Sequence, residues 1–155
     1  MFAYFCSVQY TGSFVDNRVH GKGKMDYANG CFYRGEFEES RKHGKGIYTW
    51  TNGNCYKGQF VWDSMCGMGE MQYREGHVYT GIWEKNKKHG FGVFKYARNH
   101  KYEGMWHEDV RHGNGKMTFF CGSFMEETYE GGWDNDERHG YEPAAVSISK
   151  RTLCP

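Results

Sequence analysis

A tyrosine recurs at a fixed spacing of 23 residues along most of this 155-residue chain. The five equally spaced residues are Tyr10, Tyr33, Tyr56, Tyr79 and Tyr102. A sixth copy of the pattern starts at Tyr129, after an insertion of four residues. A fixed period of this length is typical of proteins in which one supersecondary unit stacks on the next. The spacing therefore predicts a repeat array, whose core runs along its length.

Glycine and the large apolar residues follow the same period. With each tyrosine counted as position 0, glycine recurs at positions 2, 11, 13 and 20, and only Gly132 of the 22 glycines lies elsewhere. Position 4 is always Phe or Trp, position 15 is Met, Phe or Tyr, and position 17 is Tyr, Trp or Phe. Because the chain has a single leucine, we expect its core to be thin and built largely from aromatic rings.

The recurring positions are two residues apart, which is the side-chain period of a β-strand and not of a helix. Each repeat is therefore predicted to form two short strands. Asn29-Gly30 and Asn52-Gly53 are dipeptides that favour tight hairpin turns, so we expect the shorter connection there. The connection over positions 5 to 10 is rich in charged residues, and we expect it to be longer and to lie at a solvated edge.

Stacked hairpins predict an all-β fold, a single-layer antiparallel sheet that is elongated and twisted. Glycine within a strand needs a packing reason, so we expect the aromatic residues at positions 0, 4 and 17 to cover the glycines of adjacent strands. The predicted repeat array covers residues 1–142, with a partial repeat at 1–9. Complete repeats are expected to start at residues 10, 33, 56, 79, 102 and 129. Residues 143–155 are interpreted as a C-terminal tail that caps the array or docks elsewhere.

Composition argues against several classes of function. The net charge is +1, which offers no electrostatic reason to bind nucleic acid. No apolar stretch approaches the roughly 20 residues of a membrane helix, and the first residues do not resemble a signal peptide, so we expect a soluble intracellular protein. The six cysteines do not recur at one repeat position, which is typical of free thiols and not of a disulfide framework.

Enzymatic and metal chemistry find little support in the pattern. Histidine recurs at position 10, but equivalent positions in stacked hairpins lie about 10 Å apart, too far to share one metal ion. Gly-x-Gly at positions 11 to 13 is not followed by the helix and lysine of a phosphate-binding loop. No nucleophile is paired with a histidine outside the repeat pattern. We therefore expect no catalytic residues, no metal and no cofactor.

The unit that runs from Tyr79 to Tyr96, and its five siblings, closely resemble the MORN (membrane occupation and recognition nexus) repeat. The resemblance covers residues 10–140. It implies a single-layer sheet of hairpins that serves as a rigid scaffold or a peptide-binding groove without catalytic activity. Because the chain has little besides repeats, it looks most like the small, nearly all-MORN proteins of axonemes and other cytoskeletal assemblies. The stretches 10–15 and 101–106 resemble radial spoke head proteins.

The aromatic rows are the predicted binding surface. A single-layer sheet has two faces and cannot bury both by itself, and exposed tyrosine and tryptophan are common in binding hot spots. We therefore expect a helix or an extended peptide of a partner protein to lie across these rows. Trp62 is out of register, in a turn, and is a second candidate contact. The candidate residues are Tyr33, Phe37, Tyr56, Phe60, Trp62, Tyr79, Trp83, Tyr102 and Trp106.

The sequence thus predicts a scaffold or adaptor in a larger assembly of the cytoplasm and cytoskeleton, such as the radial spoke head of a ciliary or flagellar axoneme. Two alternatives stay open. One is a peripheral membrane tether that binds acidic phospholipids, which the balanced charge disfavours. The other is a regulatory peptide-binding partner of a motor or an enzyme. The open first strand also permits a homodimer through edge pairing.

Overall fold

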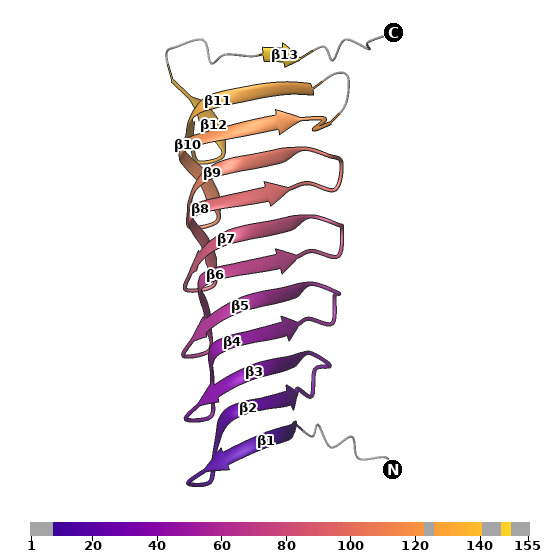
Figure 1. Ribbon diagram of the computed structural model, residues 1–155, viewed down its shortest axis with the longest axis vertical. Coiled ribbons are helices and arrows are strands. Elements are labelled where there is room, and N and C mark those ends of the chain that lie inside the picture. The colour runs from indigo at the N-terminus through magenta and orange to yellow at the C-terminus, as the bar shows by residue number, and fades with distance from the viewer. Residues whose placement is uncertain (1–7, 123–125, 141–146, 150–155) are drawn as a thin grey trace.

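The computed structural model describes residues 8–122, 126–140 and 147–149, which form thirteen β-strands in one sheet. Figure 1 shows the strands stacked as a single layer along the long axis of the molecule, with β1 and β13 at opposite ends. The strands are β1 (Gln9–Val15), β2 (Arg18–Asp26), β3 (Phe32–Glu38), β4 (Arg41–Thr49), β5 (Cys55–Val61), β6 (Ser64–Gln72), β7 (Val78–Glu84), β8 (Lys87–Lys95), β9 (Lys101–His107), β10 (Val110–Phe119), β11 (Glu126–Asp134), β12 (Glu137–His139) and β13 (Ser147–Ser149).

Consecutive strands pair antiparallel in chain order from β1 to β12, so each strand lies beside its neighbour in sequence. The predicted all-β, single-layer sheet of stacked hairpins is confirmed. β13 pairs with β11, where Ile148 lies opposite Glu127. The predicted partial repeat falls mostly on residues 1–7, which lie outside the described residues, as does most of the tail. The described part of the chain contains no helix long and apolar enough to span a bilayer.

The two kinds of connection are the reverse of what the sequence predicted. The charged connection is the tight one: only Asp16 and Asn17 separate β1 from β2, and both have positive φ, 49° and 59°. Two successive positive φ values are the signature of a type I′ hairpin turn. The connection with Asn29-Gly30 instead spans five residues, with Gly30 at φ 82°. The prediction was wrong because Asn-Gly is also favoured in longer turns that need one positive φ.

Position 7, the second residue of each tight turn, binds the preceding repeat through two hydrogen bonds. Its N–H donates to the carbonyl oxygen of position 9 one repeat earlier, at 2.9–3.1 Å. Its side-chain oxygen accepts from the N–H of that same residue, at 2.8–3.2 Å. These bonds continue the ladder beyond the last regular strand pair. The five pairs are Ser40 with Val19, Asp63 with Lys42, Asn86 with Met65, Asp109 with Lys88, and Asp136 with Arg111.

In the first five repeats, the position 0 tyrosine lies over two facing glycines of its own hairpin. Gly81 of β7 pairs with Gly92 of β8, and a Cβ added to Gly81 would lie 2.6 Å from both the Gly92 Cα and the Tyr79 hydroxyl oxygen. The Tyr79 hydroxyl donates a hydrogen bond to the carbonyl oxygen of Ile82 at 2.9 Å. The corresponding hydroxyl bond is present in all six repeats. The prediction that the position 0 rings cover glycines is therefore confirmed.

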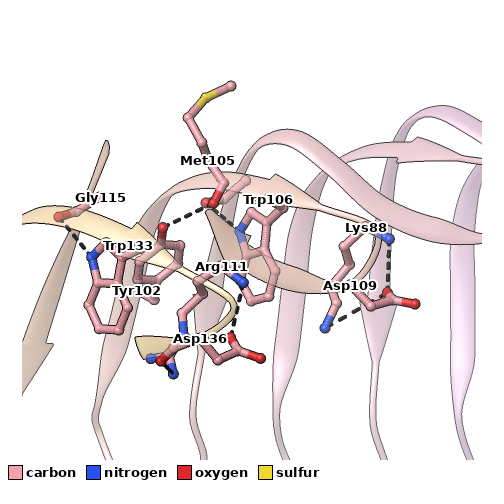
Figure 2. Close-up of polar contacts among 10 residues, drawn as sticks. Lys88, Tyr102, Met105, Trp106, Asp109, Arg111, Gly115, Trp133 and Asp136 are labelled. Atoms are coloured by element: carbon pink, nitrogen blue, oxygen red, sulfur yellow. Dashed lines mark hydrogen bonds and ion pairs between the residues drawn. The ribbon is translucent and has the colours of Figure 1, made fainter. Parts of the chain in front are cut away.

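The position 4 rings join successive repeats into one core. Each from Phe37 onward packs edge-on against the tyrosine of its own repeat and the tyrosine of the repeat before, with ring centroids 5.0–5.4 Å apart. In the last three repeats the indole N–H also donates to a glycine carbonyl of the preceding repeat, as from Trp133 to Gly115 (Figure 2). The result is a continuous row of interlocked rings along the array.

A methyl group at a glycine beneath a tyrosine ring should destabilise the whole array. We expect Gly81→Ala to lower the free energy of unfolding by about 3 kcal/mol, because the new Cβ displaces both Tyr79 and the facing Gly92 backbone. Urea denaturation followed by circular dichroism measures this loss. The matched control is Gly76→Ala, where φ is 86° but the nearest neighbour of the new Cβ is the Ala97 Cβ at 3.4 Å. We expect this control substitution to lower the free energy of unfolding by only about 1 kcal/mol. Equal losses would contradict the proposed packing.

The turn side chain that bonds the preceding repeat is a second test. We expect Asp109→Ala to lower the free energy of unfolding by about 1.5 kcal/mol, because the Lys88 N–H loses its acceptor. Asp109→Asn keeps the side-chain oxygen and tolerates the positive φ, so its cost should stay within about 0.5 kcal/mol. Thermal denaturation of the two variants in the same buffer distinguishes them. A large loss for the asparagine variant would mean that charge, and not the hydrogen bond, stabilises the turn.

Candidate functional site

The sheet has two unlike faces. The tyrosine face carries positions 0, 2, 4, 13, 15 and 17, and the opposite face carries positions 1, 3, 12, 14 and 16, because side chains alternate along each strand. The strand pairing fixes this assignment: Tyr79 lies opposite Phe94 and Gly81 opposite Gly92, so residues of the same face meet across each hairpin. Figure 2 shows the Met105 side chain, at position 3, pointing away from the rings of Tyr102 and Trp106.

Eight of the nine predicted contact residues are buried within the protein itself. The four tyrosines among them are 0% exposed and the four position 4 rings are at most 5% exposed, so these eight residues are core and do not line an open groove. The prediction that this row is exposed is wrong, because each ring is enclosed by the tyrosine of the next or preceding repeat. The eight are Tyr33, Phe37, Tyr56, Phe60, Tyr79, Trp83, Tyr102 and Trp106.

In four of the six repeats, a long cationic side chain at position 9 lies over the aromatic rings of the tyrosine face. The Lys88 ammonium lies 4.5 Å from the ring centre of Trp106, and the Arg111 guanidinium lies 4.3 Å from that of Trp133 (Figure 2). Each also pairs with an acidic residue of the following turn, Arg111 with Asp136 at 2.8 Å. Burial lowers the pKa of Lys88. A cation over an aromatic face is favourable, so these stems help to bury the position 0 and position 4 rings without a second layer.

Trp62, the ninth candidate, is exposed. It lies at the first position of a tight turn with φ 49°, and 45% of its surface is accessible. Its ring packs against the guanidinium of Arg41 at 5.7 Å and the imidazole of His43 at 5.1 Å. A bulky residue with positive φ stores strain, which is a common feature of functional sites. Trp62 thus stays a candidate contact at the edge of the array.

The opposite face holds a shallow hollow of about 1240 Å³ over β1 to β6. Its lining is rich in cations at positions 1, 12 and 14, which belong to the first three repeats. Asp26, Glu36 and Glu70 also contribute to it, so the hollow has a basic balance. The cations are Lys22, Lys24, Arg34, Lys45 and Lys57.

An apolar stripe continues from the hollow across β6, β7, β8 and β9. We give this name to Met68, Ile82, Phe91 and Met105, which are 39–57% exposed. Met68 lies directly opposite Ile82 in the sheet, and Phe91 lies directly opposite Met105. Met68 also lines the hollow, so the two features form one continuous surface.

Sequence reasoning missed the apolar stripe because positions 3 and 12 do not repeat. Position 3 is Ser13, Glu36 and Gln59 in the first three repeats but Ile82 and Met105 in the next two. The change from polar to apolar residues at position 3 was the signal that could have identified the stripe. Strand alternation places position 3 on the face that has no aromatic core, so an apolar residue is not required there. Such residues contribute nothing to the ring row on the other face.

Two of the position 10 histidines lie beside carboxylates of their own repeat. The Nε2 atoms of His43 and His89 lie 3.4 and 3.7 Å from carboxylate oxygens of Glu38 and Glu84. Within residues 8–122, 126–140 and 147–149, no group of three or more histidine, cysteine or acidic side chains could hold a metal ion. The four cysteines in these ranges are unpaired thiols.

Comparison with known families gives six consecutive matches. The family described as MORN repeat matches residues 10–32, 33–55, 56–78, 79–101, 102–123 and 129–141. Each match starts at one of the position 0 tyrosines, and together they span most of the chain. No curated protein matches the chain significantly.

The buried tyrosines predict alkaline sensitivity. Burial raises the pKa of Tyr102 and of Tyr48 to about 12, and raises the pKa values of Tyr33, Tyr56 and Tyr79 further. Since these groups ionise near pH 10 in the unfolded chain, the unfolded state releases protons first, and stability is lost as the pH rises from about 10 to 12. Melting temperatures measured between pH 8 and 12 should fall above pH 10. Tyrosinate absorbance that reaches its full value near pH 10 while the fold persists would contradict this.

Proposed function

Because the chain belongs to the MORN repeat family, we propose that it is a non-catalytic scaffold that binds partner proteins through its opposite face. MORN repeats are typically non-catalytic modules that bind proteins or membrane lipids. The assembly we propose for this chain is a ciliary or flagellar axoneme complex such as a radial spoke head. Its location would then be the cytoskeleton of the cilium.

The apolar stripe is the observation that carries this proposal. A single layer of six repeats buries its aromatic core on the tyrosine face, so the four exposed apolar residues of the opposite face are not needed for folding. Exposed apolar side chains that adjoin one another, with a polar rim, mark protein interaction sites. Met68 and Phe91 are the most exposed of the four, each more than half accessible.

Rigidity and shape support a structural role. The ring row and the paired turn bonds join every repeat to the next, so the array can hold partners at fixed spacings along its length. The stretches 10–15 and 101–106 resemble radial spoke head proteins, which is the reason for placing the assembly in the axoneme. The formal charge of +1 gives no general attraction to nucleic acid or anionic membranes.

Proximity labelling with the full chain in ciliated and non-ciliated cells tests the proposal. The chain should label axonemal proteins in ciliated cells, and the double variant Ile82→Ser/Phe91→Ser should lose most of that labelling. Variants at Tyr79 or Trp83 are unsuitable because those residues belong to the core. Phe120→Ser, which alters an exposed aromatic residue away from the apolar stripe, is the matched control and should label normally.

Three outcomes would contradict the proposal. If the double variant labels the same proteins as the natural chain, the opposite face is not the binding surface. Neighbours drawn from membranes and lipid enzymes would favour a membrane tether instead. Neighbours that are the same in both cell types would separate the protein from the axoneme while leaving protein binding in place. Circular dichroism of each variant shows that the sheet is intact.

A further inference from the structure

From the apolar stripe and the basic hollow beside it, we infer that the opposite face binds an amphipathic α-helix that is acidic at one end. The apolar side of this helix would lie on the stripe, across β6 to β9, and its acidic end would lie in the hollow over β2 to β5. This inference rests on the proposed function and names the chemistry of the partner segment.

The dimensions of the sheet suit a helix that runs across the strands. Neighbouring strands lie about 4.8 Å apart, and a helix rises about 5.4 Å per turn. A helix laid along the array therefore places about one turn over each strand. Residues spaced i, i+3 or i+4, i+7, and i+10 or i+11 on its apolar side would meet the stripe in order: Met68, Ile82, Phe91 and Met105.

The apolar stripe is continuous across the middle of the array. Ile82 of β7 lies opposite His89 of β8, one residue before the bulge glycine Gly90. A Cβ added to Gly90 would lie 3.1 Å from the Cδ1 of Ile82, so Ile82 reaches over the backbone toward Phe91. The two cross-strand pairs therefore form one row and not two separate patches.

The hollow supplies the charge that selects an acidic segment. Lys24 pairs with Asp26 at 2.7 Å, but the other four cations of the lining have no ion pair among the described residues. Two of these four cations have an acidic residue directly opposite in the sheet: Lys22 faces Glu36, and Lys57 faces Glu70. Arg34 and Lys45 face uncharged residues on the following strand, so the five cations and three acids of the lining leave a positive balance. A basic surface beside an apolar one favours a partner with complementary charge. The four cations without an ion pair in the described part of the chain are Lys22, Arg34, Lys45 and Lys57.

The charge is confined to one side of the stripe, which orients the helix. Past the stripe, Glu103 of β9 pairs with Lys101 at 2.8 Å, and Lys116 of β10 lies opposite Glu130 of β11. This end of the opposite face is balanced, whereas the end toward β2 is basic. The acidic end of the partner helix is therefore expected to lie on β2 to β5, where it is attracted by the basic surface. On β10 it would find no net electrostatic attraction.

Selection from a peptide library tests the inference even though the partner is unidentified. The probe is a phage-displayed library of helical peptides with apolar residues at i, i+3, i+4, i+7 and i+11 and random residues on both sides, selected on the full chain. Selected peptides should carry Asp and Glu on one side only. By fluorescence anisotropy they should bind at least tenfold more weakly to Phe91→Glu and to Lys45→Glu/Lys57→Glu. Arg74→Glu, a change at an exposed cation in a turn, should have no effect.

Charge reversal gives the sharpest result. A synthetic copy of a selected peptide with each acidic residue replaced by lysine should bind the Lys45→Glu/Lys57→Glu variant more tightly than it binds the natural chain. Peptides selected without acidic bias, or peptides that bind all variants equally, would overturn the inference, as would failure to select any. None of these results would bear on labelling of axonemal proteins, which tests the proposed function separately.

Two further measurements identify a different occupant. A dimer in light scattering that Phe91→Glu dissociates would assign the stripe to a second copy of the chain. Sedimentation with phosphatidylserine vesicles that is lost in Lys45→Glu/Lys57→Glu would assign the hollow to a membrane surface. Either result overturns the assignment of this face to an acidic amphipathic helix.

Discussion

The contact between a tyrosine ring and a pair of facing glycines is the interaction on which the rest of this protein depends. With no Cβ on either strand, the ring reaches the backbone, and its hydroxyl donates to a carbonyl three residues further along, as from Tyr102 to Met105 (Figure 2). The ring replaces the second layer that a sheet normally needs to bury one face. The contact involves residues of one hairpin only, so every hairpin can form it independently. The aromatic residue at position 4 then packs against the tyrosine of the preceding repeat and links the two repeats.

This solution separates the two faces of the sheet. On the tyrosine face, the rings of positions 0 and 4 are buried beneath one another and beneath the stems of Lys88 and Arg111, while the aromatic residues of position 17 stay partly exposed. The opposite face needs no such cover because positions 3 and 12 make no contribution to the ring row. Variation is therefore tolerated there, and the exposed apolar stripe and the basic hollow lie on this face. In the function that we propose, stability and recognition belong to different sides of one layer.

The turns explain how a single layer keeps its register. Adjacent hairpins share a regular ladder only up to the bulge at position 11, where Gly44 has φ 62°. Beyond it, the position 7 residue supplies both a donor and an acceptor to the preceding repeat, as Asp63 does for Lys42. The positive φ that Asp and Asn tolerate brings the side chain back over its neighbour. A tight turn thus serves as an inter-repeat connection.

The sequence by itself determined the repeat, its two strands per unit, the single antiparallel sheet and the match of tyrosine to glycine, since each follows from spacing along the chain. It did not determine which connection is tight, because Asn29-Gly30 and Asp16-Asn17 are both compatible with a hairpin turn. Nor did it determine which face is open. Tyr79 and Trp83 have the composition of a binding hot spot, and only the neighbouring repeats and the cations above them make them core. Burial depends on what packs against a residue across the sheet, and that is decided by the tertiary structure.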